Sequence, residues 1–287
     1  MRWSLIGLVA AVLLFWWVTE PPSLNTAALP VHEPDLANGE RVFHTGSCAS
    51  CHGEDLAGGL QIHSDFGTFV VPNISPDAES GIGGWSELAF VNAMMLGVSP
   101  DGSHYYPAFP YTSYTRMKVQ DVLDLKAYLD TFEPLASDHG PHQIGFPWNV
   151  RRGIGLWKIR YLDQGRVVVT SPGNTKAERG RYLVEGAGHC SECHTPRDRF
   201  GGLQKNLWLS GAPNPDGEGT IPNITPHKDG LASWSEADIA YYLESGFMPD
   251  FDTVGGSMVE VQENLARLPD ADRKAIAAYL KSLPARP

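Results

Sequence analysis

An internal repeat limits the folds that are open to this chain. The 287 residues repeat themselves with an offset of roughly 142 to 151 residues. The matching blocks are Gly39–Phe43 with Gly180–Val184, Val71–Pro76 with Ile221–Pro226, Trp85–Glu87 with Trp234–Glu236, and Ala127–Leu129 with Ala278–Leu280. Because these blocks recur in the same order, we predict two copies of one domain, over residues 35–135 and 173–287, joined by a connector over 136–172.

Apolar spacing predicts that each copy is mainly α-helical. Val122, Leu125 and Leu129 lie on one face of a helix over residues 118–130. The C-terminal segment shows the same spacing after a helix-start signal at Pro269-Asp270. The middle of each copy is rich in glycine and proline, which suits a small domain packed around a large flat cofactor.

All four cysteines fall in two C-x-x-C-H motifs, so no cysteine remains for a disulfide framework. The motifs supply Cys48, Cys51 and His52 in the first copy, and Cys190, Cys193 and His194 in the second. Two thiols at this spacing reach the two vinyl groups of one porphyrin, and the adjacent histidine faces the iron. A zinc finger would need further Cys/His pairs at finger spacing, and a thioredoxin-like site would need a βαβ unit. The sequence shows neither of these patterns. We therefore predict two covalently bound haem c groups, with His52 and His194 as axial ligands.

The opposite axial ligand is easier to predict in the second copy. Met258 precedes the last helix by about a dozen residues and is our predicted ligand there, with Met248 as the alternative. The repeat places Phe109 near the Met258 position in the first copy, and phenylalanine cannot bind iron. Met117 is our predicted first-copy ligand, although its repeat partner is Leu268. The other candidates are His104, Met94, Met95, His63 or an open site.

The first 20 residues are strongly apolar from the third residue to Val18. A spanning helix needs about 17–25 such residues, and Trp16 and Trp17 are typical interfacial anchors. We predict an N-terminal transmembrane helix over residues 1–20 in a bacterial inner membrane, with a cleaved signal peptide as the alternative. Arg2 would keep the N-terminus cytoplasmic and the haem domains in the periplasm.

Charge and the connector bear on possible partners. The formal net charge of −11 excludes a typical nucleic-acid-binding protein and favours a partner with a basic docking face. The connector mixes aromatic residues with Arg151, Arg152, Lys158 and Arg160. It is expected either to form a short helix packed across both domains or to serve as a docking, membrane-surface or propionate-neutralising segment.

Taken together, the motifs identify a resemblance to a family. Besides the two attachment motifs, they are Pro72–Pro76, Gly81–Ser86, Gly97–Gly102, Tyr106–Tyr111 and Gly256–Met258. Over residues 35–135 and 173–285 the chain resembles the cytochrome c subunits of membrane-bound periplasmic dehydrogenases for alcohols, aldehydes, gluconate and similar polyols. The resemblance implies two class I cytochrome c domains, His/Met ligation, and electron transfer from a dehydrogenase toward quinone or a terminal oxidase. Two features depart from the family: its best-known members carry three haems, and many have methionine where Phe109 stands.

The expected function is electron relay between a periplasmic dehydrogenase and the respiratory chain, without catalytic residues in this chain. Two alternatives remain. One is a dihaem redox enzyme of the peroxidase type, which needs an open or switchable iron. The other is a stand-alone electron shuttle that serves a terminal oxidase without any dehydrogenase.

Overall fold

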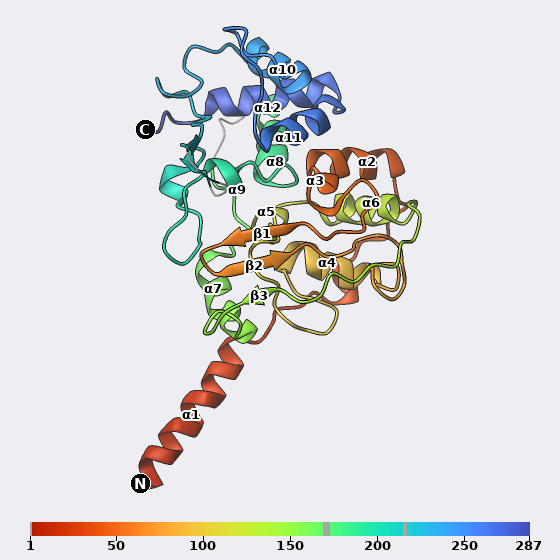
Figure 1. The fold of residues 1–287 in the computed structure, drawn as a ribbon, viewed down its shortest axis with the longest axis vertical. Helices are drawn as coiled ribbons and strands as arrows, with labels where there is room; N and C mark the ends of the chain where they lie inside the picture. The colour runs from red at the N-terminus through yellow and green to blue at the C-terminus, as the bar shows by residue number, and fades with distance from the viewer. Residues whose placement is uncertain (1, 169–172, 215–216, 218) are drawn as a thin grey trace.

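The computed structural model describes residues 2–168, 173–214, 217 and 219–287, so the connector is described without residues 169–172. The predicted mainly helical architecture is confirmed (Figure 1). The first body contains α2 (Leu36–Thr45), α3 (Cys48–His52), α4 (Glu87–Leu96), α5 (Tyr111–Tyr114) and α6 (Val119–Leu129). The second contains α8 (Thr175–Glu185), α9 (Ser191–His194), α10 (Glu236–Ser245), α11 (Met258–Ala266) and α12 (Asp270–Ser282).

Short strands and turns fill the loops between these helices. In the first body β1 (Gln61–Ser64), β2 (Gly67–Val70) and β3 (Gln143–Ile144) form an antiparallel sheet in that order. In the second, β4 (Ala212–Pro213) pairs with β5 (Thr220–Ile221). The single-turn 3₁₀ segments are η1 (Thr26–Ala28), η2 (Arg151–Gly153) and η3 (Lys205–Leu207).

The repeated Trp-Ser-Glu block marks the start of a helix in each body. The Ser86 hydroxyl accepts the Ala89 N–H at 3.2 Å at the start of α4. The Ser235 hydroxyl accepts the Asp238 N–H at 3.1 Å at the start of α10, where a full capping box forms. Each serine therefore satisfies a backbone donor that the first turn of a helix leaves free.

The same close helix crossing organises both bodies. α2 packs on α6, and α8 packs on α12. A Cβ atom on Gly39 would lie 2.2 Å from the Asp124 carbonyl oxygen, and one on Gly180 would lie 1.8 Å from that of Ala275. Glycine lowers helix propensity, but here it allows two backbones to touch. The repeated glycine ahead of each haem motif therefore sets the contact between the first and last helix of its body.

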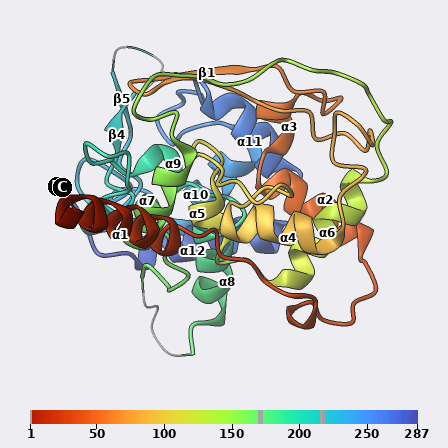
Figure 2. The ribbon, with the colours of Figure 1, turned by 90° about the horizontal axis from the view of Figure 1, so that it is seen from below.

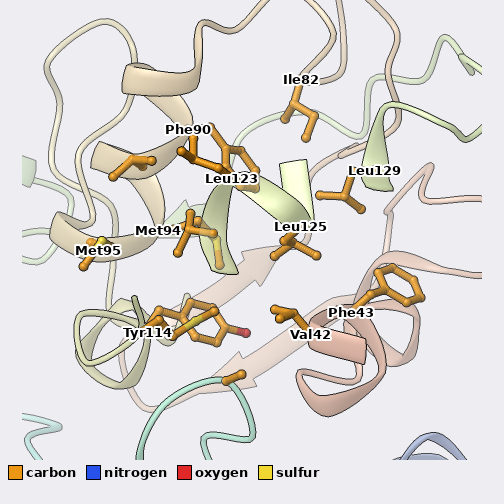
Figure 3. Packing of buried hydrophobic residues seen from close by; sticks show 14 of the residues in the cluster. Val42, Phe43, Ile82, Phe90, Met94, Met95, Tyr114, Leu123, Leu125 and Leu129 are labelled. Carbon is orange, nitrogen blue, oxygen red and sulfur yellow. The ribbon is translucent and has the colours of Figure 1, made fainter. Parts of the chain in front are cut away.

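Each crossing encloses its own apolar cluster. In the first body, side chains from α2, α4 and α6 converge on one centre (Figure 3). The second cluster is built from the equivalent helices α8, α10 and α12. The attachment residues Cys48 and Cys190 pack against the first and second clusters respectively. Each predicted haem site therefore adjoins a separate core.

The connector forms a short helix that packs across both bodies, which was one of the two interpretations of its sequence. This helix is α7 (Ile154–Tyr161). Lys158 Nζ donates to the Leu96 and Gly97 carbonyl oxygens at 2.6 and 2.7 Å, at the end of α4. On the other side, Trp157 Nε1 donates to the Phe200 carbonyl oxygen at 2.8 Å.

The prediction of a transmembrane helix over residues 1–20 is wrong. The segment forms α1 (Arg2–Val18), which extends away from the two bodies (Figure 1). Across the described residues, no helix is both long enough and apolar enough to span a bilayer. The 17 residues of α1 correspond to about 26 Å at the usual rise, against a hydrocarbon core of about 30 Å. The helix ends at Val18, and Thr19 is buried in the first body, where Arg152 donates to its hydroxyl and His104 to its carbonyl oxygen.

We expect Gly39→Ala to destabilise the holoprotein. At an open helical site this change stabilises by about 1 kcal/mol, but here the new methyl group would overlap the α6 backbone, and overpacking costs roughly 1–3 kcal/mol. Denaturant unfolding of Gly39→Ala should be compared with that of Gly145→Ala, where no atom lies within 4 Å of the added Cβ. An unchanged or higher midpoint for Gly39→Ala would contradict the close crossing.

Candidate haem-binding sites

Both attachment motifs are entered through the same unusual backbone conformation. Ser47, directly before Cys48, has a φ of 46°, and His189, directly before Cys190, has a φ of 38°. Residues other than glycine rarely adopt this left-handed region, and such strain concentrates at functional sites. The sequence alignment of the two motifs gave no sign of this feature, because neither residue is a glycine.

The two predicted axial histidines are held in the same way. His52 Nδ1 donates to the Pro72 carbonyl oxygen at 2.8 Å, and His194 Nδ1 donates to that of Pro222 at 2.8 Å. A carbonyl oxygen only accepts, so the proton must be on Nδ1 and the lone pair on Nε2. Both imidazoles are thereby oriented with Nε2 ready to bind a metal.

The Pro-Asn pair that recurs in both copies also anchors the loop that carries each acceptor. Asn73 Nδ2 donates to the Leu135 carbonyl oxygen at 2.6 Å, and Asn223 Nδ2 donates to that of Arg286 at 2.7 Å. Each asparagine Oδ1 accepts the backbone N–H two residues further on. The proline carbonyl that holds each histidine is thus fixed to the chain that follows the last helix of its body.

Burial sets the protonation states of these groups. It lowers the pKa of His52 to about 4, against the opposing effect of its hydrogen bond to Pro72, and it also lowers the pKa of His194. It raises the pKa of Cys48 and Cys190 to about 12. Before haem attachment the imidazoles are therefore neutral at neutral pH, as metal binding requires, and the Cys48 and Cys190 thiols are protonated.

The residues around the motifs fit a bound group that carries polar substituents, such as the propionates of haem. Among the described residues, several buried polar atoms without a hydrogen-bond partner cluster near the attachment cysteines: Ser47 Oγ, Ser50 Oγ, His189 Nδ1 and Ser191 Oγ. Burying such groups without a partner is costly, so they are expected to face a ligand. Cys48 and Cys190 are half-buried, whereas Cys51 and Cys193 are exposed. Each pair thus has one thiol at the core and one at the surface, an arrangement that fits a haem with one exposed edge.

Two of the candidate ligands in the first body lie close to its attachment motif. Met117 and Met94 line one small cavity together with Cys48 and Tyr114. Figure 3 shows Met94 and Tyr114 on one side of this region and Val42 on the other.

The other first-body candidates lie elsewhere. His104 is buried and donates to the Thr19 carbonyl oxygen at the base of α1. His63 lies on β1 and contacts the Thr68 hydroxyl. Met95 is a core residue of α4. None of these three lines the small cavity beside Cys48.

In the second body Met258 is the first residue of α11 rather than part of a loop. It packs against the same apolar cluster as Cys190. Phe109 follows α4 at the same distance in sequence as Met258 follows α10. Its ring instead contacts Tyr105, Tyr111 and Tyr114. Met248, the second candidate, lies half-buried in a turn after α10.

Several known proteins are similar in sequence to this chain over most of its length. A protein of Cereibacter sphaeroides called "Diheme cytochrome c-type" is 50% identical over 299 residues, with 99% of each chain covered. The "Fructose dehydrogenase cytochrome subunit" of Gluconobacter japonicus is 36% identical, covering 89% of this chain. The "Gluconate 2-dehydrogenase cytochrome c subunit" of Pantoea cypripedii is also 36% identical, covering 92%. This chain spans only 54% and 64% of those two subunits.

The match to a protein family follows the internal repeat. The sequence model of the cytochrome c family matches twice, over residues 36–133 and 177–284. Each matched segment contains one attachment motif and one histidine held by a proline carbonyl. The chain carries two covalently bound haem c groups and transfers electrons. It belongs to the cytochrome c family.

Proposed function

We propose that this dihaem cytochrome c accepts electrons from a dehydrogenase on the periplasmic side and passes them toward the respiratory chain. The main support is that both copies hold their attachment-motif histidine by the same Nδ1 hydrogen bond. This gives the chain two similar redox sites. Relatives named as cytochrome subunits of fructose and gluconate dehydrogenases support the dehydrogenase partner. The haem groups supply reversible one-electron chemistry when bound.

We propose His52 with Met117, and His194 with Met258, as the axial ligand pairs. Met117 is 5% exposed and lines the cavity that contains Cys48, which supports it over His104 and His63. Met258 packs beside Cys190 on the second cluster. A thioether ligand opposite histidine raises the reduction potential and closes the iron to other ligands, as electron transfer requires.

The protein contributes orientation and burial to both sites. The proline carbonyls fix the imidazole tautomer and make Nε2 a stronger donor. The two apolar clusters exclude water on the inner side of each site. The exposed cysteines Cys51 and Cys193 place one side of each site at the surface, where electrons enter and leave.

The ligand pairs predict the spin state of each haem. Met258→Leu should convert one of the two ferric haems from low to high spin, because leucine cannot bind iron. Met117→Leu should convert the other haem. Electron paramagnetic resonance of the oxidised protein measures the two spin states. Met95→Leu removes a buried methionine of α4 and serves as the control that keeps both haems low-spin.

A fully low-spin Met117→Leu protein would exclude Met117, and Met94→Leu would then test the second methionine in that cavity. Carbon monoxide binding distinguishes the peroxidase-type alternative. Two closed sites should bind little of it in the reduced wild-type protein, whereas an open iron would bind it in a one-to-one ratio with that haem.

The dehydrogenase partner predicts a stable complex. Tagged protein purified from its own cells should retain a dehydrogenase, identified by mass spectrometry. Addition of that enzyme's substrate should reduce both haems, as followed by their absorbance. Recovery with a terminal oxidase and no dehydrogenase, with haems that no dehydrogenase substrate reduces, would instead support the stand-alone shuttle.

A further inference from the structure

Two of the contacts between the bodies are reciprocal, besides the hydrogen bonds that join Tyr182 of α8 to Lys118 and Asp121. α5 follows the Phe109 position in the first body and lies beside α9, the second attachment helix (Figures 1 and 2). α11, its counterpart in the second body, lies beside α3 and contacts α2. Each body therefore places one short helix, α5 or α11, against the haem-attachment region of the other body.

The first of these contacts is centred on one carboxylate. Glu192 Oε1 accepts hydrogen bonds from the hydroxyls of Thr112 and Ser113 on α5, both at 3.0 Å. Glu192 Oε2 accepts from Arg197 at 2.5 Å, within its own body. Ser113 is fully buried, and only 12% of the Glu192 side chain is exposed. The carboxylate is therefore held between the two bodies rather than solvated.

Packed side chains next to this contact connect the surroundings of the two attachment cysteines. Tyr114, the next residue of α5, has its ring 5.6 Å from the ring of His189, directly before Cys190. Tyr114 also lines the cavity that contains Cys48, and Ala187 from the second body lines the same cavity. The path from Cys48 to Cys190 therefore runs through packed side chains on both sides of the interface.

Haem attachment does not account for Glu192. It stands at a variable position of the C-x-x-C-H motif, and the equivalent residue of the first motif is Ser50. Ser50 has no partner for its buried hydroxyl in the described part of the chain. The contact from the other side is of a different kind, with His44 Nδ1 2.8 Å from Asn264 Oδ1. The carboxylate contact is thus a feature of the second motif alone.

We propose that Glu192 is a positioning residue for the pair of haems. By accepting hydrogen bonds from Thr112 and Ser113, it holds the second attachment helix against α5 and fixes the separation of the two haem groups. Electron exchange between two carriers falls steeply with their separation, so a fixed interface keeps both haems in one relay. The inference depends on the two haem groups and not on the identity of any partner.

The test measures the magnetic dipolar coupling between the two ferric haems by pulsed electron paramagnetic resonance. Glu192→Ala should weaken and broaden this coupling, because the bodies can then move apart. Glu192→Gln keeps an oxygen acceptor for the two hydroxyls and should retain the wild-type coupling. Glu236→Ala, which removes an exposed carboxylate paired with Lys176, is the matched control and should change nothing.

A second variant approaches the contact from the first body. Thr112→Val with Ser113→Ala removes both donors without touching the second attachment motif, so it should weaken the coupling with both haems still bound and low-spin. This variant decides the question if Glu192→Ala loses its second haem. Wild-type coupling in the Thr112→Val/Ser113→Ala protein would overturn the proposal.

Discussion

The hydrogen bond from a histidine Nδ1 to a proline carbonyl is the interaction on which each site depends. It occurs twice, from His52 to Pro72 and from His194 to Pro222, with the same length of 2.8 Å. It fixes the imidazole tautomer and presents Nε2, while burial keeps the ring neutral. The helix crossings at the two glycines, the hydrogen bonds of the two asparagines and the apolar clusters hold the histidine and the proline of this bond in place.

The two copies share the elements that surround the axial histidine but differ on the opposite side of the predicted haem. Each body keeps its helix crossing, its serine-capped helix and its Pro-Asn loop. The distal position differs, because Met258 stands in the second body where Phe109 stands in the first. The attachment motifs also differ, since Glu192 contacts the first body and its equivalent Ser50 does not contact the second in this way. The elements that the two bodies share surround the attachment motifs. The positions at which they differ can give the two haems different reduction potentials.

The sequence was sufficient for the features that follow from local pattern. The repeat, the two motifs and the apolar spacing predicted the mainly helical cytochrome c domains and the two haem groups. The N-terminal segment was predicted from its hydropathy to span a membrane, whereas the helix that forms, α1, covers only Arg2–Val18.

Other features were inaccessible because they involve the backbone or residues distant in sequence. The acceptor for each histidine is a main-chain carbonyl, so the repeated proline indicated a loop but not its partner. The left-handed Ser47 and His189 have no glycine to mark them. The contact of Glu192 with α5 joins residues about 80 positions apart, which no spacing within a motif can predict.

The reduction potentials of Asn73→Ala and Asn223→Ala show whether the histidine–proline hydrogen bonds set the donor strength of the axial imidazoles. Each change frees the loop that carries one proline carbonyl, and so weakens the hydrogen bond that makes the imidazole a stronger donor to oxidised iron. If the oxidised state loses about 1 kcal/mol of stabilisation, the reduction potential of a one-electron couple rises by an amount on the order of 40 mV. We expect such a rise in the potential of the first haem alone for Asn73→Ala and of the second haem alone for Asn223→Ala. Unchanged potentials in both variants, with both haems bound, would contradict it.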